Sequence, residues 1–184
     1  HRELSDPDEA ATMTIQRRRA LLVASTATAA TLLSGCSFAK HPGPKGDWDR
    51  LEDGDLLLAV PKGWDRSVAQ SSIWGTKWTD PSDKSAVLMT AQSIEATDGY
   101  DALDLAMNAA RAVTRGYQPV GSRTAVTNGS IILAQQQYQT TWPYQKKGSL
   151  WAISRDSKIC LVDFSGEKIT SDQISTLGQW IELR

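Results

Sequence analysis

The feature that most constrains the fold of this chain is a series of short, strand-like segments, each closed by turn-forming residues. The segments are rich in Val, Ile, Leu, Thr and Trp, and clusters such as PKG at 61–63 and DPSD at 80–83 end them. Strands are expected at residues 55–60, 72–79, 86–94, 124–127, 131–142, 149–155 and 158–164. Such a chain is expected to build most of its core on an antiparallel sheet.

The apolar periodicity changes once, in the middle of the chain. Between residues 100 and 115 the apolar side chains recur at helical spacing, at Leu103, Ala106, Met107, Ala110 and Val113. Asp98 or Asp101 is expected to cap the start of this helix, and Gly116 to follow its end. The segment therefore predicts one amphipathic helix among the strands.

A second helix is expected near the C-terminus, capped by Thr170 or Ser171. Asn128-Gly129 and Asp156-Ser157 predict tight hairpin turns between the later strands. The expected order of elements is βββ-α-ββββ-α. This order predicts the α+β class, with helices packed on an antiparallel sheet.

The N-terminal part has the layout of an export signal. A basic cluster, Arg17, Arg18 and Arg19, precedes an uncharged apolar run at 20–33, and small residues follow. The run is shorter than the about 20 apolar residues that a membrane-spanning helix needs. We therefore expect a cleaved signal peptide over residues 13–35.

Four residues at the end of this signal, Leu33, Ser34, Gly35 and Cys36, resemble a bacterial lipobox. The resemblance implies that Cys36 receives a diacylglyceryl group, becomes the mature N-terminus and anchors the protein at the extracellular face of the cell membrane. Anchoring that is stable takes two acyl chains, such as palmitate, because one chain binds only marginally. A Cys36–Cys160 disulfide is the alternative, although the apolar run around Cys160 favours a buried thiol.

The remaining N-terminal segments complete the expected organisation. Residues 1–12 are acidic and polar and are interpreted as an upstream extension that is not native. The arginine pair within the signal leaves general secretion and twin-arginine export both open. Residues 36–46 are rich in Pro and Gly and predict a tether. Residues 47–184 then form a single α+β domain.

Within this domain, a first strand that ends in Pro61-x-Gly63-Trp64, a central helix, a meander and a short last helix resemble the PsbP-like fold. In particular they resemble the actinobacterial LpqN-type lipoproteins. The resemblance implies a twisted antiparallel sheet with helices packed on it. It also implies a non-enzymatic binding, docking or assembly module on the cell surface, without catalytic residues.

Charge and motifs point away from catalysis. The formal net charge of the chain is −1, whereas nucleic-acid binding requires a positively charged surface. The domain contains no histidine, and the sequence has no zinc-type cluster or nucleotide loop. The acidic residues at 47–55 do not follow EF-hand spacing and are interpreted as a solvated stretch before the first strand. We expect no metal, cofactor or nucleic-acid partner; a hydrolase that uses Asp163 is the less favoured alternative.

The candidate binding residues are aromatic and basic. Trp142 and Tyr144 fall in a predicted loop beside Lys146 and Lys147, a combination typical of contacts with a protein or envelope partner. The alternative function is a carrier of a small apolar ligand or lipid. Its pocket would lie between sheet and helix, and a cavity of about 300 Å³ or more would favour it. Residues expected in that pocket are Met89, Met107 and some of the seven tryptophans.

Overall fold

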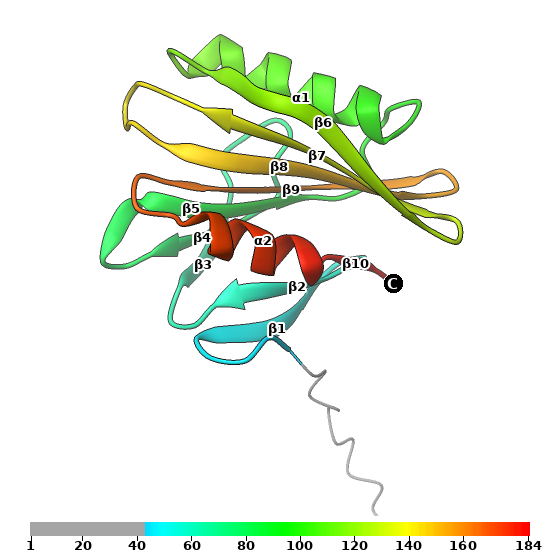
Figure 1. Cartoon of the computed structure of the whole chain (residues 1–184), viewed down its shortest axis with the longest axis horizontal. Coiled ribbons are helices and arrows are strands. Elements are labelled where there is room, and N and C mark those ends of the chain that lie inside the picture. The colour runs from blue at the N-terminus through cyan, green and yellow to red at the C-terminus, as the bar shows by residue number, and fades with distance from the viewer. Residues whose placement is uncertain (1–42) are drawn as a thin grey trace, which may run out of the picture. The chain divides into compact units, whose positions relative to one another are not determined.

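The computed structural model describes residues 43–184 (Figure 1). The extension at 1–12, the signal peptide at 13–35 and most of the tether at 36–46 lie outside the described residues. So do the individual residues predicted for export and lipid attachment: Arg17, Arg18, Arg19, Leu33, Ser34, Gly35 and Cys36.

The described part of the chain contains ten strands and two helices. In chain order they are β1 (Trp48–Asp53), β2 (Leu56–Pro61), β3 (Asp65–Val68), β4 (Thr76–Asp80), β5 (Asp83–Ala91), α1 (Gly99–Val113), β6 (Gln118–Asn128), β7 (Ile131–Gln139), β8 (Lys147–Arg155), β9 (Lys158–Gly166), α2 (Ser171–Gln179) and β10 (Glu182–Leu183). The strands form two antiparallel sheets, one in the order β1-β2-β10 and one in the order β3-β4-β5-β9-β8-β7-β6.

The antiparallel sheets with separate helices agree with the predicted α+β class, but the predicted order βββ-α-ββββ-α is wrong in detail. Five strands precede α1, a tenth strand follows α2, and the strands form two sheets instead of one. The missed strands β1 and β3 are mainly polar or charged, and β3 is exposed along its whole length. Edge strands of this kind bury little, so they lack the apolar pattern that marks a strand in sequence.

Helix α1 begins and ends close to the predicted positions. The Asp98 side chain accepts a hydrogen bond of 2.9 Å from the backbone N–H of Asp101, which confirms Asp98 as the cap. At the other end the N–H of Thr114 donates to the carbonyl of Ala110, and Gly116 follows with φ +66°. Positive φ there allows the chain to turn back into β6.

The central strands β8 and β9 bury both of their faces. Trp151 and Val162 belong to an apolar cluster that includes Leu177 of α2, whereas Leu150 and Leu161 belong to a cluster with Leu103 of α1. Successive side chains of a strand point to opposite faces. The two helices therefore cover opposite faces of the seven-stranded sheet.

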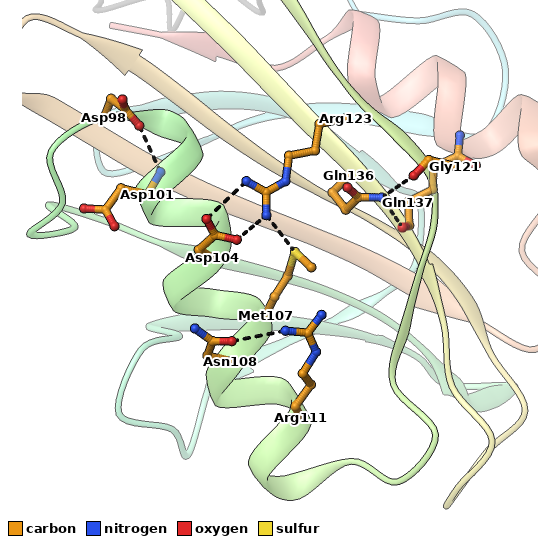
Figure 2. Close-up of polar contacts among 10 residues, drawn as sticks. All are labelled: Asp98, Asp101, Asp104, Met107, Asn108, Arg111, Gly121, Arg123, Gln136 and Gln137. Carbon is orange, nitrogen blue, oxygen red and sulfur yellow. Dashed lines mark hydrogen bonds and ion pairs between the residues drawn. The ribbon is translucent and has the colours of Figure 1, made fainter.

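Polar contacts hold α1 against the edge of this sheet (Figure 2). Arg123 of β6 forms an ion pair with Asp104 on α1, and its guanidinium lies 3.8 Å from the sulfur of Met107. On the neighbouring strand, the Gln136 amide donates to the carbonyl of Val120 at 3.1 Å. The ion pair therefore joins the helix to β6, and the Gln136 hydrogen bond joins β7 to β6.

The turn between β6 and β7 lies one residue later than predicted. Asn128 pairs with Ile131, so Gly129 and Ser130 are the two central residues of the turn. Gly129 has φ +59°, while Ser130 has no positive φ. A type II′ turn needs positive φ at its first central position only, and glycine supplies it there.

The acidic stretch at 47–55 contains the first strand instead of preceding it, while Asp47, Asp49 and Glu52 are exposed as predicted for a solvated stretch. It contains β1, which ends in Asp53 with a side chain that is buried. Asp53 Oδ1 accepts hydrogen bonds from Arg66 at 2.7 Å and Thr76 at 3.1 Å, and Oδ2 accepts one from Thr90. The carboxylate therefore links the three-stranded sheet to β3, β4 and β5 of the other sheet.

Asp53→Ala is expected to lower the free energy of unfolding by about 3 kcal/mol, because it leaves the buried hydroxyl of Thr90 and the half-buried hydroxyl of Thr76 without their acceptor. Asp65→Ala, on the exposed strand β3, is the matched control and should change stability by less than about 0.5 kcal/mol. Urea unfolding followed by tryptophan fluorescence measures both. Equal effects of the two variants would contradict the linking role of Asp53.

Candidate functional site

A cavity of about 530 Å³ lies between α1 and the seven-stranded sheet. Small side chains on α1 create its space, because Ala106, Ala109 and Ala110 face it where longer residues would fill it. The opposite wall comes from the sheet, and residues 70–74 form one side. We call this space the α1 cavity.

The polar group at the base of the α1 cavity is Asp163 of β9. In the sheet it pairs with Leu150 on one side and Met89 on the other, and its side chain is 5% exposed. The phenol of Tyr138 donates a hydrogen bond of 2.7 Å to Oδ1. Within residues 43–184 no donor lies on Oδ2, so this oxygen is left to the cavity.

Tyr138 reaches Asp163 across a glycine. Tyr138 on β7 pairs with Gly148 on β8, which pairs in turn with Ser165 on β9, two residues from Asp163. A Cβ at position 148 would lie 2.6 Å from Tyr138 Cζ and 2.7 Å from Ser165 Cβ. No other residue fits there without displacing the tyrosine.

A second tyrosine holds the first in place. The rings of Tyr117 and Tyr138 stack with their centroids 4.6 Å apart and an interplanar angle of 23°. Burial, together with the charge of Asp163, raises the pKa of both phenols well above its usual value. Both therefore keep their protons at physiological pH, and Tyr138 remains a donor to the carboxylate.

Two charged groups line the α1 cavity, Asp163 and Lys146. Burial raises the pKa of Asp163 to about 6, an effect that the Tyr138 hydrogen bond and the charge of Lys146 partly offset. Burial also lowers the pKa of Lys146, which Asp163 partly opposes. A carboxylate held in such an environment costs folding free energy, and sites of this kind are common where a ligand or substrate supplies the missing partner.

The loop between β7 and β8 contributes Pro143 and Lys146 to the lining of the cavity. Trp142 and Tyr144 are 56% and 37% exposed, and Pro143 between them lines the cavity. The Arg115 guanidinium lies 5.6 Å from the centroid of the Trp142 ring, and the Lys146 ammonium lies 5.4 Å from that of Tyr144. The two exposed rings therefore lie in the same loop as Pro143 and Lys146, which line the cavity.

The structure brings together only part of the residues predicted for binding. Lys146 is half-buried and points into the α1 cavity, whereas Lys147 is the exposed first residue of β8. Met89 lines the cavity as expected, but Met107 of α1 is buried in the apolar cluster with Leu103 and does not line it. Tyr138 is a site residue that the sequence did not predict. Its one signal in the sequence is a tyrosine on the inward face of a strand.

The tryptophans divide between the two faces of the sheet. Trp151 is buried in the cluster beneath α2, as expected for a core residue, and Trp64 packs against the same cluster. Trp74 lines the α1 cavity. Trp74 precedes β4 and packs in the cluster on the α1 face of the seven-stranded sheet. Trp78, within β4, packs in the cluster on the α2 face. Trp180 ends α2 and lies 5.0 Å from the Arg50 guanidinium.

A second cavity of about 680 Å³ lies on the opposite face, between α2 and the β6–β8 strands. Leu133 and Trp151 of the sheet and Ile174 of α2 line it. Unlike the α1 cavity it contains no buried ionisable side chain, so we take the α1 cavity as the candidate site. Within residues 43–184 the structure shows no group of three or more side chains suited to hold a metal ion, and no helix long and apolar enough to cross a bilayer.

Cys160 is a free thiol in the core. It is fully buried on β9, and its sulfur lies 3.4 Å from the side-chain oxygen of Gln92. Burial raises the pKa of the thiol above its usual value. These features agree with the prediction of a buried thiol; Cys36, the other residue of the alternative disulfide, lies outside the described residues.

No protein-family model and no curated protein matches the chain. Among solved structures, the solution structure of cyanobacterial PsbP (CyanoP) from Synechocystis is similar, with a TM-score of 0.59 and 14% identity over 78% of this chain and 98% of that one. The predicted PsbP-like fold is thereby confirmed. A protein of unknown function from Pseudomonas aeruginosa matches with a TM-score of 0.38 and 11% identity, over 71% of this chain and 88% of that one, which is too low to support an argument.

Asp163→Asn is expected to raise the free energy of unfolding by up to about 3 kcal/mol above pH 6. Burial raises the pKa of Asp163 to about 6, and one pKa unit corresponds to about 1.4 kcal/mol. The folded state holds this proton more tightly than the unfolded chain does. The contribution of Asp163 to the free energy of unfolding of the wild type is therefore complete below about pH 4 and is lost as pH rises through about 6. Urea unfolding across this range measures the difference.

Asp83→Asn is the matched control with the opposite sign. A hydrogen bond from Ser85 lowers the pKa of Asp83, so this carboxylate stabilises the fold above pH 4 and loses its contribution in acid. The variant should therefore be less stable than the wild type at neutral pH. A stability difference for Asp163→Asn that stays constant from pH 4 to 7 would contradict the proposed burial of charge.

Proposed function

We propose that this protein is a lipoprotein of the LpqN type, of actinobacterial origin, anchored by its lipid at the extracellular face of the cell membrane. Its proposed role is to bind a small amphipathic ligand in the α1 cavity. The observation that carries the binding role is the cavity itself. Its volume of about 530 Å³ falls within the range of about 300–1,000 Å³ typical of small-molecule sites. Its apolar wall and single buried carboxylate suit a ligand with an apolar body and a polar head.

The proposed role is binding without chemistry. The polar partner of Asp163 is a tyrosine, and within residues 43–184 no second carboxylate lines the α1 cavity. A carboxylate-based hydrolase uses two such groups in concert. Binding therefore accounts for the arrangement with fewer assumptions than hydrolysis does.

Docking to a protein or envelope partner is the second candidate function. It is favoured by the exposed rings of Trp142 and Tyr144 and by the exposed Lys147 that follows them in the chain. Large aromatic side chains dominate the binding energy of protein interfaces. Because Pro143 and Lys146 of the same loop line the α1 cavity, a partner that docks on the two rings can receive the ligand from it. We propose the two roles as parts of one transfer function.

The proposed anchor predicts that Cys36→Ala protein moves from the membrane fraction to the soluble fraction, because the thiol that accepts the lipid is gone. Cys160→Ala is the control and should remain with the membranes. Fractionation of expressing cells followed by immunoblotting measures both. Cys36→Ala protein that sediments with the membranes as the wild type does would exclude the anchor.

The proposed cavity predicts that Ala110→Trp weakens the binding of the apolar fluorophore N-phenylnaphthylamine at least tenfold, because the indole fills space beneath α1. Ala112→Trp is the matched control on the same helix, where position 112 is exposed and does not line the cavity. Fluorescence titration measures the affinity. Undiminished binding to folded Ala110→Trp protein would place the fluorophore elsewhere.

A further inference from the structure

Two opposite charges in the α1 cavity lack partners. The Oδ2 atom of Asp163 has no hydrogen-bond donor within residues 43–184, although this residue is only 5% exposed. The Lys146 ammonium forms neither an ion pair nor a hydrogen bond with any side chain or carbonyl of the same part of the chain, and lies only over the Tyr144 ring. Both groups line the cavity.

These charges are close enough to influence each other but do not pair. Each shifts the pKa of the other in the direction expected for attraction, while burial dominates both shifts. Water or a bound molecule must satisfy the remaining hydrogen-bonding capacity of each group. A molecule that pairs with both at once recovers more of the desolvation cost than one that pairs with either alone.

The walls beside these charges are apolar and aromatic. Trp74 and Met89 lie on one side, Leu150 lies beside Asp163 in the sheet, and the alanines of α1 lie opposite. This surface suits one planar or branched apolar group. With a volume of about 530 Å³, the cavity has room for such a group together with a short polar head.

We propose that the α1 cavity binds a small zwitterion, an α-amino acid with an aromatic or large apolar side chain. Its ammonium group donates to Asp163 Oδ2, its carboxylate accepts from the Lys146 ammonium, and its side chain packs against Trp74 and Met89. This inference rests on the proposed binding function and adds the chemical class of the ligand.

Charge complementarity separates this ligand from simpler ones. A lone amine pairs with Asp163 and leaves Lys146 without an anion, next to a second positive charge. A lone carboxylic acid pairs with Lys146 and faces the negative charge of Asp163. Like charges in a cavity of low dielectric repel strongly, so only the zwitterion satisfies both sites.

Isothermal titration calorimetry with three probes tests the inference: L-phenylalanine, phenethylamine, which lacks the carboxylate, and phenylpropionate, which lacks the ammonium. Wild-type protein should bind L-phenylalanine at least tenfold more tightly than either analogue. Lys146→Gln should bind phenethylamine as tightly as L-phenylalanine, and Asp163→Asn should do the same for phenylpropionate. Lys147→Gln, an exposed matched control, should keep the wild-type order.

The outcomes separate the ligand class from the binding function. If N-phenylnaphthylamine binds in the α1 cavity but L-phenylalanine does not bind or binds no better than its analogues, the zwitterion inference is wrong and the cavity remains a binding site. If neither the fluorophore nor any of the three probes binds, the proposed binding function fails as well. Variants that weaken all three probes equally would also overturn the assigned pairing.

Discussion

The whole structure depends on the alternation of side chains along β8 and β9, which buries both faces of these two strands. Trp151 and Val162 pack beneath α2, while Leu150 and Leu161 pack beneath α1. Because a strand has only two faces, this pattern fixes both helix positions and the register of the central sheet. It also places Asp163 on the α1 face, where a one-residue shift would turn it toward α2.

The segments with strong apolar signals were predictable from sequence, and the polar ones were not. The segment ICLVDF of β9 and the helical spacing around Leu103 identify their elements because they bury apolar surface. The strands β1 and β10 lack this signal. They flank β2 in the three-stranded sheet, and the Arg50–Glu182 ion pair of 2.6 Å joins them to each other. Such contacts join residues distant in sequence, and no local pattern encodes them.

The candidate site was predictable in part for the same reason. Asp163 stands out in sequence as an acidic residue in an apolar strand, and Trp142 and Tyr144 stand out as aromatics in a loop. Their connection through Lys146, which turns inward from that loop to the cavity, depends on the packing of α1 and the sheet. The space itself arises from alanines, which read in the sequence as ordinary helix formers.

Gly148 is part of a sequence signature of the site that can be sought in other sequences. The phenol of Tyr138 reaches the carboxylate of Asp163 only because the strand between them carries a hydrogen atom in place of a side chain. Tyrosine, glycine and aspartate on three successive strands of a meander therefore belong together as a unit. Homologous proteins that contain all three residues are expected to have the same polar base in this cavity. Those with a larger residue in place of the glycine are expected to have a different base, whatever their sequence identity elsewhere.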